Sequence, residues 1–148
     1  MSKVIAERSF IVESSRERVW DLIGKVIFRS LPGMENIVIV DDSNFEASLK
    51  MKVLLLELRM KLKGQIVDMS PPDSLAVKLA IEGPGGLFRI ILKVTIVTPS
   101  IEEGRTAVAC QVTAERMGIL LRGLSLGYPR RFSQSTFEAI ENRLKELV

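Results

Sequence analysis

Few side chains in this sequence can perform acid–base, nucleophilic or metal chemistry. It contains no histidine and one cysteine, Cys110, so Ser–His and Cys–His nucleophiles and the commonest metal ligand are absent. Carboxylates and the single tyrosine, Tyr128, remain as proton donors or acceptors. The segment Gly83-Pro84-Gly85-Gly86 lacks the lysine of a phosphate-binding loop and predicts a turn. We therefore expect no catalytic residue, metal ligand or cofactor.

The clearest pattern is an alternation of apolar and polar residues between Phe45 and Asp68, which changes phase once in the middle. Strict alternation predicts antiparallel strands with one buried and one solvated face. The phase change predicts a reversal or a bulge near Leu54–Glu57. In a reversal, Leu54, Leu55 and Leu56 form an exposed apolar tip that suits a membrane, a partner or a dimer mate. In a bulge, the same leucines are buried, and the sequence does not decide between the two.

The remaining elements follow from periodicity and turn residues. Helical spacing of apolar residues predicts one or two short helices over Arg16–Leu31, with Ser14 and Glu17 at capping-box spacing. A second helical pattern runs from Pro129 to Leu147, about 19 residues or 28 Å. The expected strands are Val4–Val12, Met34–Val40, Phe45–Val53, Glu57–Asp68, Leu75–Glu82, Leu87–Thr98 and Arg105–Glu115.

This element order predicts one α+β domain over residues 1–148. A curved seven-stranded antiparallel sheet wraps around the long C-terminal helix, and two short helices follow the first strand. No apolar run is long enough to span a membrane, and we expect no secretory signal. A lone cysteine with apolar neighbours predicts a buried, inert thiol and a cytoplasmic location.

The order of elements resembles the helix-grip fold of the START-like (SRPBCC) superfamily, and most closely the G-subunit family of carbon monoxide dehydrogenase. The segments that carry the resemblance are Phe10–Val12, Val19-Trp20, Pro32-Gly33, Gly64–Asp68, Gly118–Leu121 and Gly123. The sequence departs from the family at Leu54–Glu57, where relatives have Gly-Pro. The resemblance implies an interior cavity for an apolar molecule such as a lipid or an isoprenoid quinone.

Apolar side chains expected to face inward from the sheet and the last helix are the candidate cavity lining. They are Leu49, Met51, Met60, Leu62, Leu79, Ile81, Phe88, Ile90, Met117, Tyr128, Phe132, Thr136 and Ile140. The alternative is that these residues fill a solid core. Trp20, beside the apolar stripe of the first helix, suits the rim of a cavity or ordinary core packing.

Charged residues suggest a second kind of contact. Arg122, Arg130 and Arg131 lie around an apolar, glycine-punctuated stretch, which suits an anionic membrane surface or a protein partner. The alternative is that these arginines are simply solvated. The outward sheet face is rich in lysine, but aromatic residues make up only 5% of the chain and none lies among these lysines, so nucleic acid is not an expected partner.

Three functions are consistent with this sequence. The first is a non-enzymatic carrier or accessory protein that holds an apolar small molecule between sheet and helix. The second is a polyketide-cyclase or hydratase type of enzyme using the same cavity. The third is an adaptor for a larger oxidoreductase, docked to a partner or peripherally to the inner face of the membrane, with a homodimer as one arrangement. The first is the preferred prediction.

Overall fold

The computed structural model describes residues 3–53, 55–83, 86–97, 104–116 and 127–148. The strands are β1 (Lys3–Val12), β2 (Met34–Ile39), β3 (Asn44–Val53), β4 (Leu56–Ser70), β5 (Ser74–Gly83), β6 (Gly86–Val97) and β7 (Thr106–Arg116). The helices are α1 (Arg16–Arg29) and α3 (Gly127–Leu147). The seven expected strands are confirmed, with ends that shift by a few residues.

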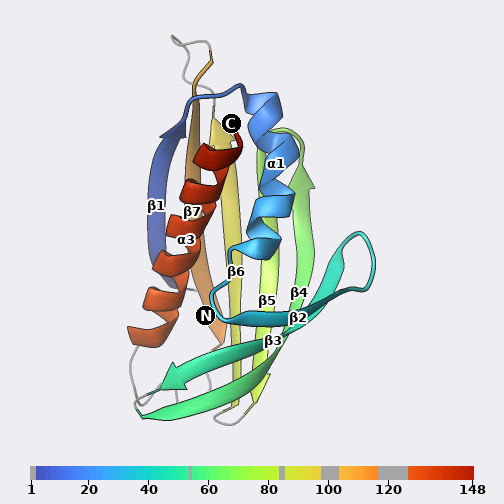
Figure 1. The fold of residues 1–148 in the computed structure, drawn as a ribbon, viewed down its shortest axis with the longest axis vertical. Coiled ribbons are helices and arrows are strands. Elements are labelled where there is room, and N and C mark those ends of the chain that lie inside the picture. The colour runs from blue at the N-terminus through green and yellow to red at the C-terminus, as the bar shows by residue number, and fades with distance from the viewer. Residues whose placement is uncertain (1–2, 54, 84–85, 98–103, 117–126) are drawn as a thin grey trace.

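The strands form one antiparallel sheet in the order β1-β7-β6-β5-β4-β3-β2. Consecutive strands pair from β2 to β7, and β1 closes the far side against β7. Register shifts interrupt the β1–β7, β2–β3, β4–β5 and β6–β7 pairings, and such bulges bend strands and increase twist. The result is a strongly curved sheet whose concave face carries both helices (Figure 1).

The phase change between β3 and β4 is a chain reversal, not a bulge. Val53 pairs directly with Leu56, and the register continues from there to the Asn44–Gln65 pair. Leu55 lies in the turn and is fully exposed. The reversal moves the core positions from odd residues on β3 to even residues on β4, as the alternation requires.

Helix α1 corrects two details of the sequence prediction. Its N-cap is Ser15, which accepts a hydrogen bond from the Arg18 amide at 3.3 Å, and not Ser14. The Ser14 carbonyl instead accepts from the Thr106 hydroxyl at 2.7 Å, which fixes the end of β1 against β7. One continuous helix also replaces the two short helices expected after the first strand. Burial of its apolar face outweighs the weak helix propensity of Gly24.

Helix α3 packs mainly against β1 and α1, and α1 also contacts β6. In Figure 1 the two helices lie side by side on the concave face, while the β2–β3 hairpin projects beyond them. Inward residues of the sheet and of both helices form one contiguous buried cluster. None of the helices in the described residues is long and apolar enough to cross a bilayer.

Candidate functional site

The predicted cavity lining from the sheet is brought together on the concave face. Leu49 pairs with Met60 across β3 and β4, Leu62 pairs with Ile81 across β4 and β5, and Leu79 pairs with Ile90 across β5 and β6. Cross-strand partners lie within about 5 Å of each other. All six side chains are buried, Met60 being the most exposed at 5%. They form a continuous apolar layer across four strands.

Helix α3 contributes side chains to the same buried cluster. Phe132, Thr136 and Ile140 are buried, and Phe132 and Ile140 belong to the same cluster as Met60 and Ile90. The predicted sheet-facing side of this helix is therefore confirmed as the buried side. Phe137, which was not among the predicted lining residues, is also buried and completes this face.

Two hydroxyl groups interrupt the apolar wall of α3. Thr136 is 2% exposed and donates to the Phe132 carbonyl at 2.8 Å, so its oxygen keeps acceptor capacity. Ser133 is fully buried on the same side of the helix. Ser133 was not among the predicted lining residues, although its spacing of three residues from Thr136 and four from Phe137 places it on this face.

The interior that these residues form is closed. Leu49, Leu62 and Ile81 have no exposed surface, and Leu79 and Ile90 have 1% each. Four hollows of about 360 to 480 Å³ lie on the described surface; Met60 lines one of them, and the other residues of the layer line none of the four. In this conformation the described part of the layer is packed, so a ligand has to displace side chains to enter it.

The other predicted contact residues lie apart from this layer. Trp20 is half-buried on α1 and packs against the cluster. Arg130 and Arg131 are exposed in the first turn of α3, which has no acidic residue to offset their charge. Leu54, Met117 and Arg122 lie outside the described residues, as do the side chains of Met51, Leu56, Phe88 and Tyr128.

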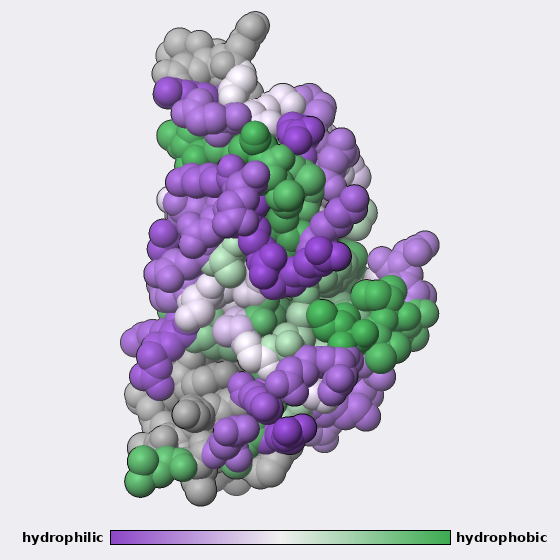
Figure 2. Space-filling view, in the orientation of Figure 1, coloured by the Kyte–Doolittle hydropathy of each residue, from purple (hydrophilic) through white to green (hydrophobic). Residues whose placement is uncertain are grey.

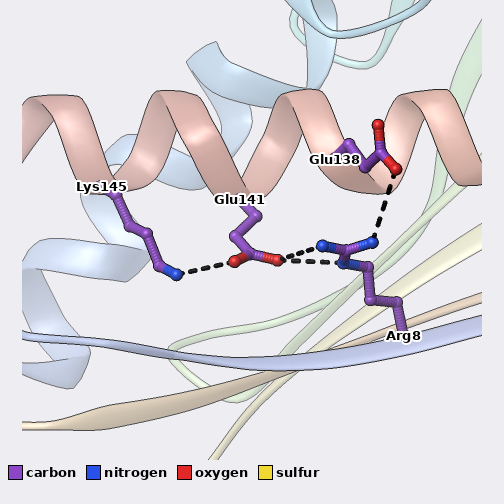
Figure 3. Close-up of polar contacts among 4 residues, drawn as sticks. All are labelled: Arg8, Glu138, Glu141 and Lys145. Carbon is purple, nitrogen blue, oxygen red and sulfur yellow. Dashed lines mark hydrogen bonds and ion pairs between the residues drawn. The ribbon is translucent and has the colours of Figure 1, made fainter.

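An ion-pair cluster attaches α3 to β1 (Figure 3). The Arg8 guanidinium contacts the Glu141 carboxylate through two nitrogens at 2.9 Å, and Lys145 contacts its other oxygen at 2.7 Å. Glu138 lies 3.8 Å from Arg8. The hydrogen bond from Lys145, followed by that from Arg8, lowers the pKa of Glu141, although its partial burial acts in the opposite direction. The cluster was not foreseen, because it joins residues 133 positions apart.

Titratable groups that could act in the interior are few. Among the described residues the buried polar side chains are Ser30, Thr106, Ser133 and Thr136, and no carboxylate is buried with them. Cys110 is buried, and desolvation raises the pKa of its thiol to about 12. The predicted burial of this thiol is confirmed. No group of metal-ligating side chains occurs within the described ranges.

The outward sheet face is less one-sided in charge than its lysines suggest. Lys50 contacts Glu35 at 3.3 Å and Glu57 at 3.9 Å, and Lys78 contacts Glu115 at 3.4 Å. These pairs are partly to largely exposed and contribute little to stability. They do neutralise part of the positive charge on this face.

The element order and the buried layer are those of the helix-grip fold. A conserved protein from Geobacillus kaustophilus superposes with a TM-score of 0.76 at 15% identity, over 95% of this chain and 94% of that chain. The Zhui aromatase/cyclase from Streptomyces sp. R1128 gives 0.64 at 13%, over 98% and 94%. A START superfamily protein from Mycobacterium smegmatis gives 0.62 at 10%, over 99% and 100%.

Sequence comparison identifies the family. The profile of the carbon monoxide dehydrogenase G-subunit (CoxG) family matches residues 9–128, so the chain belongs to this family. No curated protein matches the chain in sequence. The structural neighbours named above share so little sequence that they show the fold alone. Family and fold together suggest that the protein binds a hydrophobic ligand.

Proposed function

We propose that this protein is a carrier or accessory protein that holds an apolar molecule, lipid-like or isoprenoid-quinone-like, between β3–β6 and α3. The observation that supports this most is the apolar layer shared by four strands and one helix, which contains two hydroxyls and no buried carboxylate among the described residues. An apolar wall with a few polar groups is typical of small-molecule sites. Thr136 and Ser133 would orient a carbonyl or hydroxyl of the ligand.

Binding requires the packed layer to open. Apolar contact contributes about 25 cal/mol per Å² removed from water, so a ligand that buries a few hundred Å² offsets the cost of rearranging several side chains. Met60 suits such a rearrangement because methionine is unbranched and adapts its shape readily. Helix α3 is attached chiefly to β1 and α1, so we expect the opening on the side of β3 and β4.

Trp20 provides a direct test, because it is the only tryptophan and contacts the buried cluster. We expect a soluble isoprenoid quinone to quench its fluorescence and to raise the unfolding temperature of the delipidated protein. At a quinone concentration one hundred times Kd, the free energy of unfolding should increase by about 2.7 kcal/mol. Native mass spectrometry of the purified protein gives an independent measurement. No thermal shift and no quenching with quinones, fatty alcohols or sterols would overturn the proposal.

The interior binding site can be located with Phe132→Ala, for which Phe10→Ala is the matched control. Both side chains are buried, but Phe10 lies on β1 and pairs with Val108 on β7, away from the β3–β6 layer. Both variants lose stability, by about 3–5 kcal/mol for a fully buried phenylalanine. We expect only Phe132→Ala to change the quinone Kd. Equal effects from both variants would place the ligand elsewhere.

A second role is supported by the exposed hairpin tip. We propose that Leu55 inserts into an anionic membrane surface, with the exposed Arg59 of β4, about 10 Å beyond the Val53–Leu56 pair, to meet the headgroups. Leu55→Asp should abolish flotation with phosphatidylcholine vesicles that contain phosphatidylserine. Val67→Asp, a similar change at another exposed β4 residue, should leave flotation intact. Unchanged flotation of the Leu55→Asp variant would refute this role and leave a protein partner as the target.

A further inference from the structure

A groove of about 410 Å³ runs between the solvent-facing sides of α1 and α3. Its floor is apolar and consists of Leu22 and Val26 from α1 and Leu147 from α3. Val26 is 2% exposed, whereas Leu147 is 49% exposed. Arg18 donates to the Leu147 carbonyl at 2.9 Å and so joins the two helices at one end of the groove. Figure 2 shows apolar surface between the helices with hydrophilic surface beside it.

The rim of this groove is cationic. Lys25 and Arg29 of α1 and Arg143 of α3 line it, against a single carboxylate, Glu146. Within the described part of the chain, the side chains of these three cations form no hydrogen bond and no ion pair. The Arg8 side chain, in contrast, contacts two carboxylates.

Helix ends explain only one of these three charges. Arg29 is the last residue of α1, where the helix dipole favours a cation. Lys25 lies one turn further inside α1, and Arg143 lies one turn inside the end of α3. Because like charges placed together lower stability, convergence of all three on one apolar groove indicates a ligand that supplies the missing negative charge.

We propose that this groove binds a single-chain anionic amphiphile, a fatty-acid carboxylate. Its alkyl chain lies on Leu22, Val26 and Leu147, and its carboxylate lies between Arg29 and Arg143, which present planar donors suited to it. The volume falls in the range of small-molecule sites, roughly 300–1,000 Å³. The groove is on the outer side of the helices, so this site is distinct from the interior layer.

Three probes separate the contributions of chain and charge. We expect isothermal titration calorimetry to detect dodecanoate binding, with dodecanol about tenfold weaker and inorganic phosphate or acetate undetectable, because the site needs both parts. A higher salt concentration should lower the affinity for dodecanoate and leave the affinity for dodecanol unchanged. Equal affinity for dodecanoate and dodecanol would overturn the proposal, and so would binding of phosphate as tight as that of dodecanoate, which would indicate a simple anion site.

Surface variants locate the carboxylate without threatening the fold. Arg143→Gln and Lys25→Gln should each weaken dodecanoate by about tenfold, and Leu22→Gln should weaken both chain probes. Lys93→Gln, an exposed cation on the outward sheet face, is the matched control and should leave the affinity unchanged. If Arg143→Gln binds dodecanoate as tightly as the Lys93→Gln control does, the groove is not the site. Phe132→Ala distinguishes this test from the interior proposal, because it should leave groove binding intact.

Discussion

Substitution of Gly64 tests how tightly the buried layer is packed at its edge. Gly64 pairs with Phe45 across β3 and β4, and a Cβ at position 64 would collide with the Phe45 ring. That ring is 2% exposed and lies edge-on to Phe28, with ring centroids 4.8 Å apart at 73°. The buried ring therefore packs against both Gly64 and Phe28. Gly64→Ala therefore has to displace a packed aromatic pair.

The expected magnitude has two parts of opposite sign. Overpacking of a core costs about 1–3 kcal/mol, whereas replacing a strand glycine by alanine gains about 0.5–1 kcal/mol. Gly64→Ala should therefore lower the free energy of unfolding by about 0–2.5 kcal/mol, or up to a few degrees in unfolding temperature for a chain of this size. In a Phe45→Leu background the collision is relieved, and the same substitution should stabilise the protein.

Urea unfolding followed by Trp20 fluorescence measures all four members of this double-mutant cycle. Gly24→Ala is the matched control, because a Cβ there meets no atom within 4 Å. In a helix interior this change should stabilise by about 1 kcal/mol. The reasoning is refuted if Gly64→Ala has the same effect with and without the Phe45 ring, since the coupling would then be zero.

Three further predictions concern single sites. Glu141→Gln should cost about 1–2 kcal/mol at pH 7, because it removes charged hydrogen bonds to Arg8 and Lys145. The pKa of Glu141 in the folded protein lies below its ordinary value of 4.5, so this stabilisation is present above pH 4.5 and is lost as the pH falls through the folded pKa. Urea unfolding at a series of pH values should therefore show the stabilities of the wild type and the variant converging in acid. A difference that stays constant with pH would contradict the assignment. Cys110 should not react with Ellman's reagent at pH 8 until the protein unfolds, because burial raises the pKa of its thiol to about 12. Rapid reaction of the native protein would contradict this and would show that the interior opens readily. Ile39→Lys should change the free energy of unfolding by less than about 0.5 kcal/mol, since Ile39 is 62% exposed. Because a charge on an edge strand disfavours pairing with another chain, this variant should self-associate less in analytical ultracentrifugation. Unchanged self-association would exclude the β2 edge as the contact between copies.

The sequence predicts the sheet well because burial on one face imposes a period of two residues. The alternation in Phe45–Asp68 specifies which residues of β3 and β4 face inward, and the structure confirms Leu49, Met60 and Leu62 in the core. The same pattern left the tip at Leu55 undecided, because turn propensities do not favour leucine. Only the Val53–Leu56 pairing resolves it. Local patterns thus define faces, while the pairing of strands defines the reversal.

Features that join distant segments could not be predicted in this way. The capping-box spacing to Glu17 predicts Ser14 as the N-cap, but the structure uses Ser15, and this choice accompanies a hydrogen bond from the Thr106 hydroxyl to the Ser14 carbonyl. The ion pair between Arg8 and Glu141 also depends on where α3 lies across β1. Each depends on tertiary placement, which periodicity does not encode.

Helix α3 uses three sides for three different contacts, and this makes the proposals separable. Phe132 faces the buried layer, Glu141 faces β1, and Arg143 lines the outer groove. Because 3.6 residues make one turn, substitutions at these positions change different surfaces of the same helix. Suppose that Glu141→Gln loosens α3 from β1. The affinity for quinone in the interior should then change. The affinity for dodecanoate should change only if α3 also moves relative to α1, and the hydrogen bond from Arg18 to the Leu147 carbonyl opposes that movement. A parallel loss of both ligands would mean that the two sites share one conformational step.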